Sequence, residues 1–429
     1  GRRHQWPEDE PLGGQEPSED LAKDFMREMG EKLIREGELK REEIPALFQE
    51  FLKKREEVKV RLEGECREFE SHEPVIDYLI REGYLKEEAE QYKLTDRGFM
   101  EIGYQILLEI FESLKAEEFG LHQTKKTGMG TLPLETTREY EVGDDLRFLD
   151  VARTILNAVE RERREGGRVS IPIRIRQEDL EMKETYYETM LAIAYCIDLS
   201  STMTIGSPSR LEAAKKALWA LYTLHKKFFP RDEIYIIGFG SLAYEINPKD
   251  IPYLKAFTSL SLLHTNYQAA FRLASMKLRS SPSRNKRIIM ITDGHPSACY
   301  ADDELLRESE RKGSPLWYPE VGTWYPNWVP KTLIDKLKRE GQLVYRRFIK
   351  DGVDPRVARN TISEALKCKR SGIDIDILMI SEDKALLSFV KRLKDAVKGK
   401  AVYVRPSELG VALLLDYRNQ RRIISRLMF

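Results

Sequence analysis

The sequence of 429 residues lacks the signatures of several familiar protein classes. No run of eighteen apolar residues occurs, so no membrane-spanning helix is predicted. The first ten residues, G-R-R-H-Q-W-P-E-D-E, lack the apolar core of a secretory signal, and we expect a cytoplasmic protein. The four cysteines are far apart and form no C-x-x-C pair, which argues against a zinc site and against a disulfide framework.

Signatures of catalysis are equally scarce. No G-x-x-x-x-G-K-[ST] phosphate loop occurs, so the chain is not expected to hydrolyse ATP. The F-G-S stretch at residues 239–241 lacks the flanking pattern of a nucleophile elbow. His264 and His295 adjoin candidate site residues, but a two-metal hydrolase also needs bridging carboxylates, and none is evident. We therefore expect a protein that is not an enzyme.

An uncharged stretch at residues 191–197, L-A-I-A-Y-C-I, ends at Asp198 and a cluster of hydroxyl residues. An uncharged run of this length predicts a strand that is buried on both faces. Asp198, Ser200 and Thr202 alternate in the loop that follows, so one carboxylate and two hydroxyls surround one point. These hard oxygen ligands suit Mg²⁺ or Mn²⁺ better than zinc.

Two later residues complete the candidate site. Thr265 follows an apolar approach in L-L-H-T-N, and Asp293 ends a second buried strand in R-I-I-M-I-T-D-G. Loops at the carboxyl ends of parallel strands converge on one crevice of an open sheet. We therefore expect Thr265 and Asp293 to lie near Asp198.

The pattern D-x-S-x-T, a separate threonine and T-D-G resembles the metal-ion-dependent adhesion site of von Willebrand factor type A (VWA) domains. In that family, hydroxyl residues bind the metal directly and the aspartates act mostly through water. The resemblance implies direct ligands from Ser200, Thr202 and Thr265. It implies water-mediated contacts from Asp198 and Asp293. The hydroxyls bring no charge, so one open coordination position would accept an acidic residue of a partner.

Strands and helices alternate from Leu191 onward, which predicts an α/β fold with a doubly wound, mainly parallel sheet. The chain is predicted to consist of a disordered tail (1–18), an acidic helical domain (19–120), a connector (121–184) and a VWA domain (185–429). Within the connector, Val169 to Ile175 alternate with polar residues or proline and predict a half-buried strand.

An insertion at about residues 295–330 interrupts the VWA domain and contains the aromatic stretch W-Y-P-E-V-G-T-W-Y-P-N-W. Aromatic residues of this density beside a metal site fit a partner-binding rim. They fit equally well a loop that folds its aromatic side chains onto its own domain. The sequence leaves both interpretations open.

The N-terminal part differs from the rest in charge. Residues 17–120 contain 28 acidic and 17 basic residues, whereas residues 121–429 carry a net charge of +13. Apolar residues at helical spacing predict helices, and V-I-D-Y-L-I, Y-K-L-T-D-R-G-F and M-E-I-G-Y-Q-I-L-L resemble a winged helix. The acidic helices are expected to dock on the basic domain or on a partner. A fragment that begins near residue 121 is expected to fold alone.

The G-D-D-L-R passage of the connector and the C-terminal D-Y-R-N-Q-R-R extend the resemblance. Together with the VWA motifs they resemble prokaryotic proteins that work beside AAA+ ATPases of the MoxR or magnesium-chelatase type. The resemblance implies a Mg²⁺-dependent adaptor or co-chaperone that binds such an ATPase. The alternatives are an RNA- or DNA-associated protein, which the acidic half opposes, and a metal-dependent hydrolase.

Overall fold

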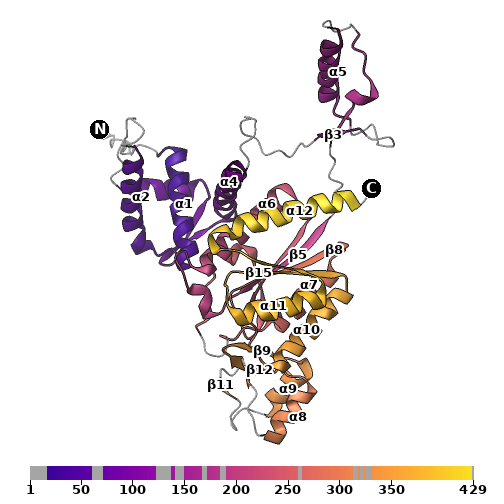
Figure 1. Cartoon of the computed structure of the whole chain (residues 1–429). Coiled ribbons are helices and arrows are strands. Elements are labelled where there is room, and N and C mark those ends of the chain that lie inside the picture. Colours follow the sequence, from indigo (N-terminus) through magenta and orange to yellow (C-terminus); the bar gives the residue numbers. More distant parts are fainter. Residues whose placement is uncertain are drawn as a thin grey trace, which may run out of the picture. The chain divides into compact units, whose positions relative to one another are not determined.

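The computed structural model divides the chain into two compact units (Figure 1). Unit 1 comprises residues 1–117 and 190–417, and unit 2 comprises residues 118–189 and 418–429. The described residues are 17–59, 71–121, 137–140, 149–166, 172–183, 190–258, 263–312, 317–318, 323–324 and 331–427. Almost all of the predicted tail therefore lies outside them. Among the described helices, none is long and apolar enough to cross a membrane.

A six-stranded sheet forms the centre of unit 1. Its order is β16-β15-β8-β5-β6-β7, and every pair is parallel except β6 with β7 at one edge. All eight residues of β5 are buried, as the uncharged sequence predicts. This confirms the mainly parallel α/β fold. The bounds are β5 (Leu191–Asp198), β6 (Glu233–Phe239), β7 (Ala243–Ile246), β8 (Asn285–Thr292), β15 (Ile373–Met379) and β16 (Lys400–Tyr403).

Helices cover both faces of this sheet. One buried cluster joins alternate residues of the strands to α7 (Tyr267–Ser280), α10 (Pro355–Arg370) and α11 (Lys384–Val397). Figure 1 shows α6 (Arg210–Phe228) and α12 (Leu409–Leu427) on the opposite side of the sheet. Arg287 of β8 donates to Asp416 of α12 at 3.0 Å, which fixes α12 to that second face.

The insertion after Asp293 forms a small antiparallel sheet with the order β11-β10-β12-β9. A hairpin of β13 (Phe348–Ile349) and β14 (Gly352–Val353) follows and leads into α10. The side chains of the aromatic stretch lie outside the described residues, so both interpretations of that stretch stay open. The other bounds are β9 (Ala298–Tyr300), α8 (Asp303–Lys312), β10 (Trp317–Tyr318), β11 (Thr323–Trp324), α9 (Lys331–Glu340) and β12 (Val344–Arg346).

The N-terminal part of unit 1 is helical, as predicted, and contains one hairpin of the kind that a winged helix requires. Phe25 lies at its core, with ring centroids 4.9 Å from Phe48 and 5.3 Å from Phe51. The bounds are α1 (Glu19–Glu36), α2 (Ile44–Lys59), α3 (Glu73–Arg81), β1 (Leu85–Glu88), β2 (Gln91–Leu94) and α4 (Asp96–Leu121).

This helical part packs directly against α6. Trp219 is fully buried, donates from Nε1 to the carbonyl of Phe99 at 2.9 Å, and stacks on the Phe99 ring. Helix α4 approaches so closely that a Cβ atom at Gly103 would lie 2.0 Å from the Thr223 hydroxyl. Position 103 therefore requires glycine, because any side chain would separate the two helices.

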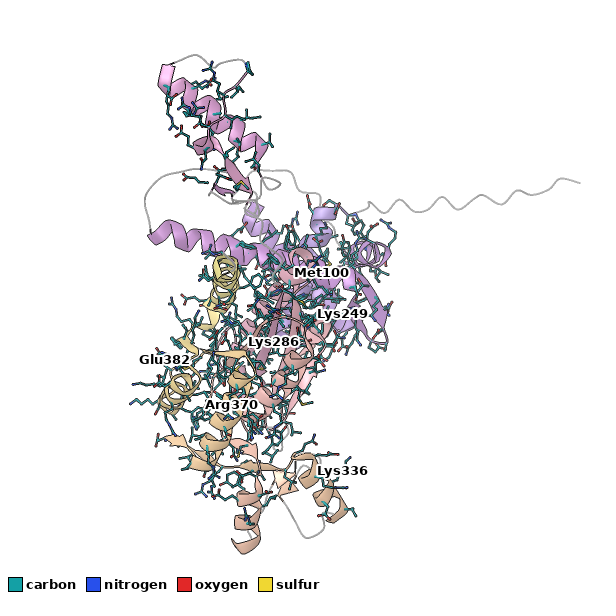
Figure 2. All side chains as sticks on the ribbon, turned by 90° about the vertical axis from the view of Figure 1, so that its right-hand side faces the viewer. Met100, Lys249, Lys286, Lys336, Arg370 and Glu382 are labelled. Carbon is teal, nitrogen blue, oxygen red and sulfur yellow. The ribbon has the colours of Figure 1, made fainter. Side chains whose placement is uncertain are left out.

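Further contacts join α4 to the turn Pro248–Tyr253. Lys249 Nζ pairs with Asp96 Oδ1 at 2.7 Å, at the start of the helix that carries Met100 (Figure 2). The acidic helices thus dock on the basic domain, and residues on both sides share one core. A fragment that begins near residue 121 is therefore no longer expected to fold alone, because it would expose the buried face of α6 to water.

A buried lysine completes this contact. Lys215 Nζ donates to the carbonyls of Leu33 and Ile34, in the last turn of α1, and to that of Leu254, at distances of 3.2, 2.8 and 2.9 Å. A cation is favourable at a helix C-terminus because unpaired carbonyls gather there. Burial nevertheless lowers the pKa of Lys215 to about 7.

Unit 2 contains α5 (Val151–Gly166) and the paired strands β3 (Thr137–Glu139) and β4 (Glu181–Lys183). Arg161 forms a two-pronged contact with Asp179, with both N–O distances 2.9 Å, and this contact lowers the pKa of Asp179. The strand predicted from Val169 to Ile175 is wrong for its described part, because residues 172–176 are not in a strand. Pro172 has no N–H to donate, and the Arg174 carbonyl accepts from Arg161 instead.

We predict that Trp219→Ala weakens folding of unit 1 as a whole. Loss of a fully buried indole is expected to lower the free energy of unfolding by about 3–5 kcal/mol. Urea unfolding measures the loss, and hydrogen exchange should accelerate in α1 and α4 as well as in α6. Met276→Ala is the control, because Met276 is 64% exposed on α7. Unchanged exchange in α1 and α4 would contradict the shared core.

We also predict a pH dependence of stability that originates at Lys215. An unfolded lysine titrates near pH 10.4, so above pH 7 the unfolded state binds a proton that the folded state lacks. Stability should therefore rise with pH between about 7 and 8.5, by at most about 1.4 kcal/mol per pH unit.

The measurement compares urea unfolding of the wild type with that of Lys215→Met, which cannot titrate. The difference between the two proteins cancels contributions from every other group. Lys226→Met, on the exposed side of the same helix, should keep the wild-type slope. An identical slope in Lys215→Met would show that Lys215 keeps its ordinary pKa.

Candidate metal centre

The two aspartates of the candidate site stand at the ends of neighbouring strands. Asp198 is the last residue of β5, and Asp293 directly follows β8, which pairs with β5 in parallel. Asp198 is fully buried and accepts from the Ser200 amide at 2.9 Å and from the Thr292 hydroxyl at 2.7 Å. The parallel register therefore brings both carboxylates to one edge of the sheet.

The hydroxyl groups of the first loop reach from one strand to the other. Ser200 Oγ lies 3.1 Å from Thr202 Oγ1, and Thr202 Oγ1 donates to Asp293 Oδ1 at 3.0 Å. A short 3₁₀ turn, Ser201–Thr204, holds Thr202 in this position. Ser200, Thr202 and Asp293 thus form one continuous chain of oxygen atoms.

Thr265 joins the site from the loop before α7. Its backbone is fixed by the Ser297 hydroxyl, which accepts from the Thr265 amide at 3.2 Å, and by the Ser297 amide, which donates to the Thr265 carbonyl at 2.9 Å. A Cβ atom at Gly294 would lie 3.9 Å from Thr265 Oγ1, so the hydroxyl faces the residue after Asp293. The structure therefore brings all five predicted residues to the same edge.

Arg210 is a member of the site that the sequence analysis missed. Its Nη1 donates to Asp293 Oδ2 at 2.6 Å. Arg210 is the first residue of α6, where the helix dipole disfavours a cation. A basic residue at this unfavourable position indicates an acidic partner nearby, and this is the sequence signal that could have identified Arg210.

Burial and like charge dominate the electrostatics of the site. Burial raises the pKa of Asp198, and the negative charge of Asp293 raises it further. Burial also raises the pKa of Asp293, although Arg210 opposes this effect. Two buried carboxylates that repel each other would be stabilised by a cation between them.

The donor set fits Mg²⁺ or Mn²⁺. The site offers carboxylate and hydroxyl oxygens, which are the hard ligands that these ions prefer. In the part of the chain that the structure describes, no group of three or more His, Cys, Asp or Glu side chains could hold a metal. The hydroxyl-based set is accordingly of a different kind from a zinc site.

The two neighbouring histidines hold loops in place. His264 Nδ1 lies 3.0 Å from the Ser297 hydroxyl, and burial, with the charge of Arg346, lowers the pKa of His264 to about 4. His295 lies between the Asp383 carboxylate at 3.3 Å and the Ile349 carbonyl at 3.0 Å. Both rings therefore serve to position backbone segments around the site.

Two segments of the chain match models of known protein families. Residues 191–312 match the vWA domain of Rv0959-like proteins, and residues 132–185 match the third domain of Rv0959-like proteins. The uncharacterized proteins Rv0959 of Mycobacterium tuberculosis and Mb0984 of Mycobacterium bovis are each 25% identical to this chain over 345 residues. Each alignment covers 80% of this chain and 44% of the relative, so the chain spans less than half of these relatives' length.

Solved structures include the PilB minor pilin from Streptococcus sanguinis, with a TM-score of 0.39 and 16% identity over 58% of this chain and 65% of the pilin. The vWF domain of the pili tip protein Mfa5 from Porphyromonas gingivalis gives a TM-score of 0.36 and 16% identity, over 55% of this chain and 95% of the domain. The sheet order and the matched family model together support a VWA-like fold for this part of the chain.

We predict that Mg²⁺ or Mn²⁺ raises the melting temperature of the wild type. A ligand present at a hundred times its Kd adds about 2.7 kcal/mol to stability if it binds only the folded state. Thr202→Val removes one hydroxyl and should abolish the rise. Thr204→Val is the matched control, because the Thr204 hydroxyl donates to the Ser201 carbonyl instead. A wild type without any shift would contradict metal binding.

Proposed function

We propose that this chain binds a partner protein by capturing its acidic side chain at a Mg²⁺ or Mn²⁺ ion. Ser200, Thr202 and Thr265 would bind the ion directly, and Asp198 and Asp293 would do so through water. The observation that carries the proposal is the chain of oxygens from Ser200 to Asp293, which joins the ends of two adjacent strands. The bound ion would offer a coordination position to a carboxylate oxygen.

The charges of the site favour an anionic ligand. Asp198 and Asp293 contribute two negative charges, and Arg210 compensates one of them through its contact with Asp293. With a divalent cation added, the site would carry a net positive charge. A carboxylate from a partner would neutralise that charge, whereas a neutral ligand would leave it buried and uncompensated.

The surroundings of the site support binding rather than bond cleavage. His264 contacts the Ser297 hydroxyl, and His295 contacts Asp383 and the carbonyl of Ile349, so both rings hold loops around the site. A base that activates water at a metal is often a histidine, and none of these contacts joins a histidine to the candidate metal ligands. The chain is therefore best explained as a binding protein.

We further propose an AAA+ ATPase of the MoxR or magnesium-chelatase type as the partner, with this chain as its adaptor. The support is the resemblance of the connector to prokaryotic proteins that work with such ATPases. The N-terminal helices, with their excess of acidic residues, belong to the same unit as the site. Negative charge opposes a phosphate backbone, which favours a protein partner over RNA or DNA.

We predict that Thr265→Val weakens binding to the MoxR-type ATPase of the same organism about tenfold or more, because it removes a direct ligand of the ion. Calorimetry with the purified ATPase measures the Kd. A variant is preferable to EDTA, because the ATPase itself needs Mg²⁺. Thr204→Val should bind like the wild type. Equal affinity of Thr265→Val and the wild type would place the interface elsewhere.

A further inference from the structure

The hairpin of β13 and β14 presents apolar side chains to solvent beside the candidate metal centre. Phe348 pairs with Val353, and Ile349 pairs with Gly352. Val353 packs against the core of unit 1, whereas Phe348 is 63% exposed and Ile349 is exposed as well. Water therefore contacts a phenylalanine and an isoleucine on adjacent positions of a folded element.

His295 fixes this hairpin to the loop of Asp293. The rings of His295 and Phe348 stack, with centroids 5.3 Å apart and planes 27° apart. His295 Nε2 also lies 3.0 Å from the carbonyl of Ile349. Because His295 follows Asp293 by two residues, the exposed side chains lie close to the site.

A second set of contacts fixes the base of the hairpin. The Arg347 amide donates to the carbonyl of Ser297 at 2.8 Å, and the Ser297 hydroxyl accepts from the amide of Thr265. After the other strand, Asp354 caps α10 and accepts three hydrogen bonds from Arg356, at 2.9, 3.2 and 3.1 Å. The hairpin is thus held in place before any partner arrives, which lowers the entropy cost of binding.

The charges around the exposed pair suit an acidic segment. Arg347 and Lys350 are both exposed on the hairpin, and Asp351 is the acidic residue between its strands. Arg347 Nε lies 3.7 Å from Asp354 Oδ2, so Asp354 and Asp351 offset part of this positive charge. The metal ion would supply most of the charge that favours an acidic segment. Complementary charge of this kind orients a partner and accelerates its association.

Ile205 adds an apolar side chain from the first site loop. It is 54% exposed, and its amide donates to the carbonyl of Thr202 at 3.1 Å. We infer that Phe348, Ile349 and Ile205 form an apolar rim that contacts the residues flanking the partner's acidic side chain. The site would then select a protein segment in which a large apolar residue neighbours an Asp or Glu. This inference rests on the proposed function.

The test uses the full chain and a library of randomised short peptides displayed on beads. Beads that bind the labelled protein in Mg²⁺ and release it in EDTA are sequenced. We expect an Asp or Glu with a large apolar neighbour. One selected peptide is then compared with the same peptide carrying glycine in place of that neighbour. The wild type should bind the first about tenfold or more tightly.

Phe348→Ser and Ile349→Ser should each reduce the ratio of the affinities for the two peptides towards one, because the apolar contact is lost while the carboxylate contact remains. Both variants should keep the Mg²⁺-dependent rise in melting temperature, which shows that the fold and the metal site are intact. Met276→Ser removes an exposed apolar side chain from α7 and should leave the ratio unchanged.

Four outcomes decide the inference. The expected ratios support it. Selection of an acidic residue without an apolar preference would overturn the rim and leave the proposed function standing. Absence of any EDTA-sensitive binding would overturn both. If the wild type forms a dimer that Phe348→Ser dissociates, a second copy of the chain covers the rim, and the inference is wrong.

Discussion

Two carboxylates buried at the ends of adjacent parallel strands impose the constraint on which this structure depends. Asp198 and Asp293 cannot both carry a charge away from water unless their surroundings supply donors and cations. The loop after β5 provides an amide and hydroxyls, β8 provides the Thr292 hydroxyl, and α6 provides Arg210. The order of strands in the sheet is what allows these separate segments to meet at one point.

The sequence permitted prediction wherever a property was local or followed from sheet topology. The uncharged run before Asp198 predicted the buried strand. The convergence of parallel strands predicted that Asp293 and Thr265 lie near Asp198. Arg210 escaped notice because its partner lies 83 residues away. The hairpin at Phe348 has a local signal in F-I-K-D-G-V, where the polar residues Lys350 and Asp351 and then a glycine separate Phe348 and Ile349 from Val353.

The contact between the two halves of unit 1 could not be predicted in detail for a related reason. Trp219 and Lys215 sit in an amphipathic helix, and the helical period alone does not tell which neighbour covers each face. The opposite charges of the halves did predict that they dock on each other. Lys216 pairs with Glu31 at 2.9 Å and with Glu109 at 3.2 Å. Such exposed pairs contribute little stability, so the buried indole and lysine hold the halves together.

The order of synthesis gives the buried lysine of α6 a further consequence. The carbonyl of Ile34 is made 181 residues before Lys215, and that of Phe99 is made 120 residues before Trp219. At about 5–20 residues per second, the end of α1 is synthesised roughly 10–40 s before the side chain that covers it. During that interval the first helices expose the surface that α6 will bury. Until α6 is made, this apolar surface stays accessible to chaperones and to other nascent chains.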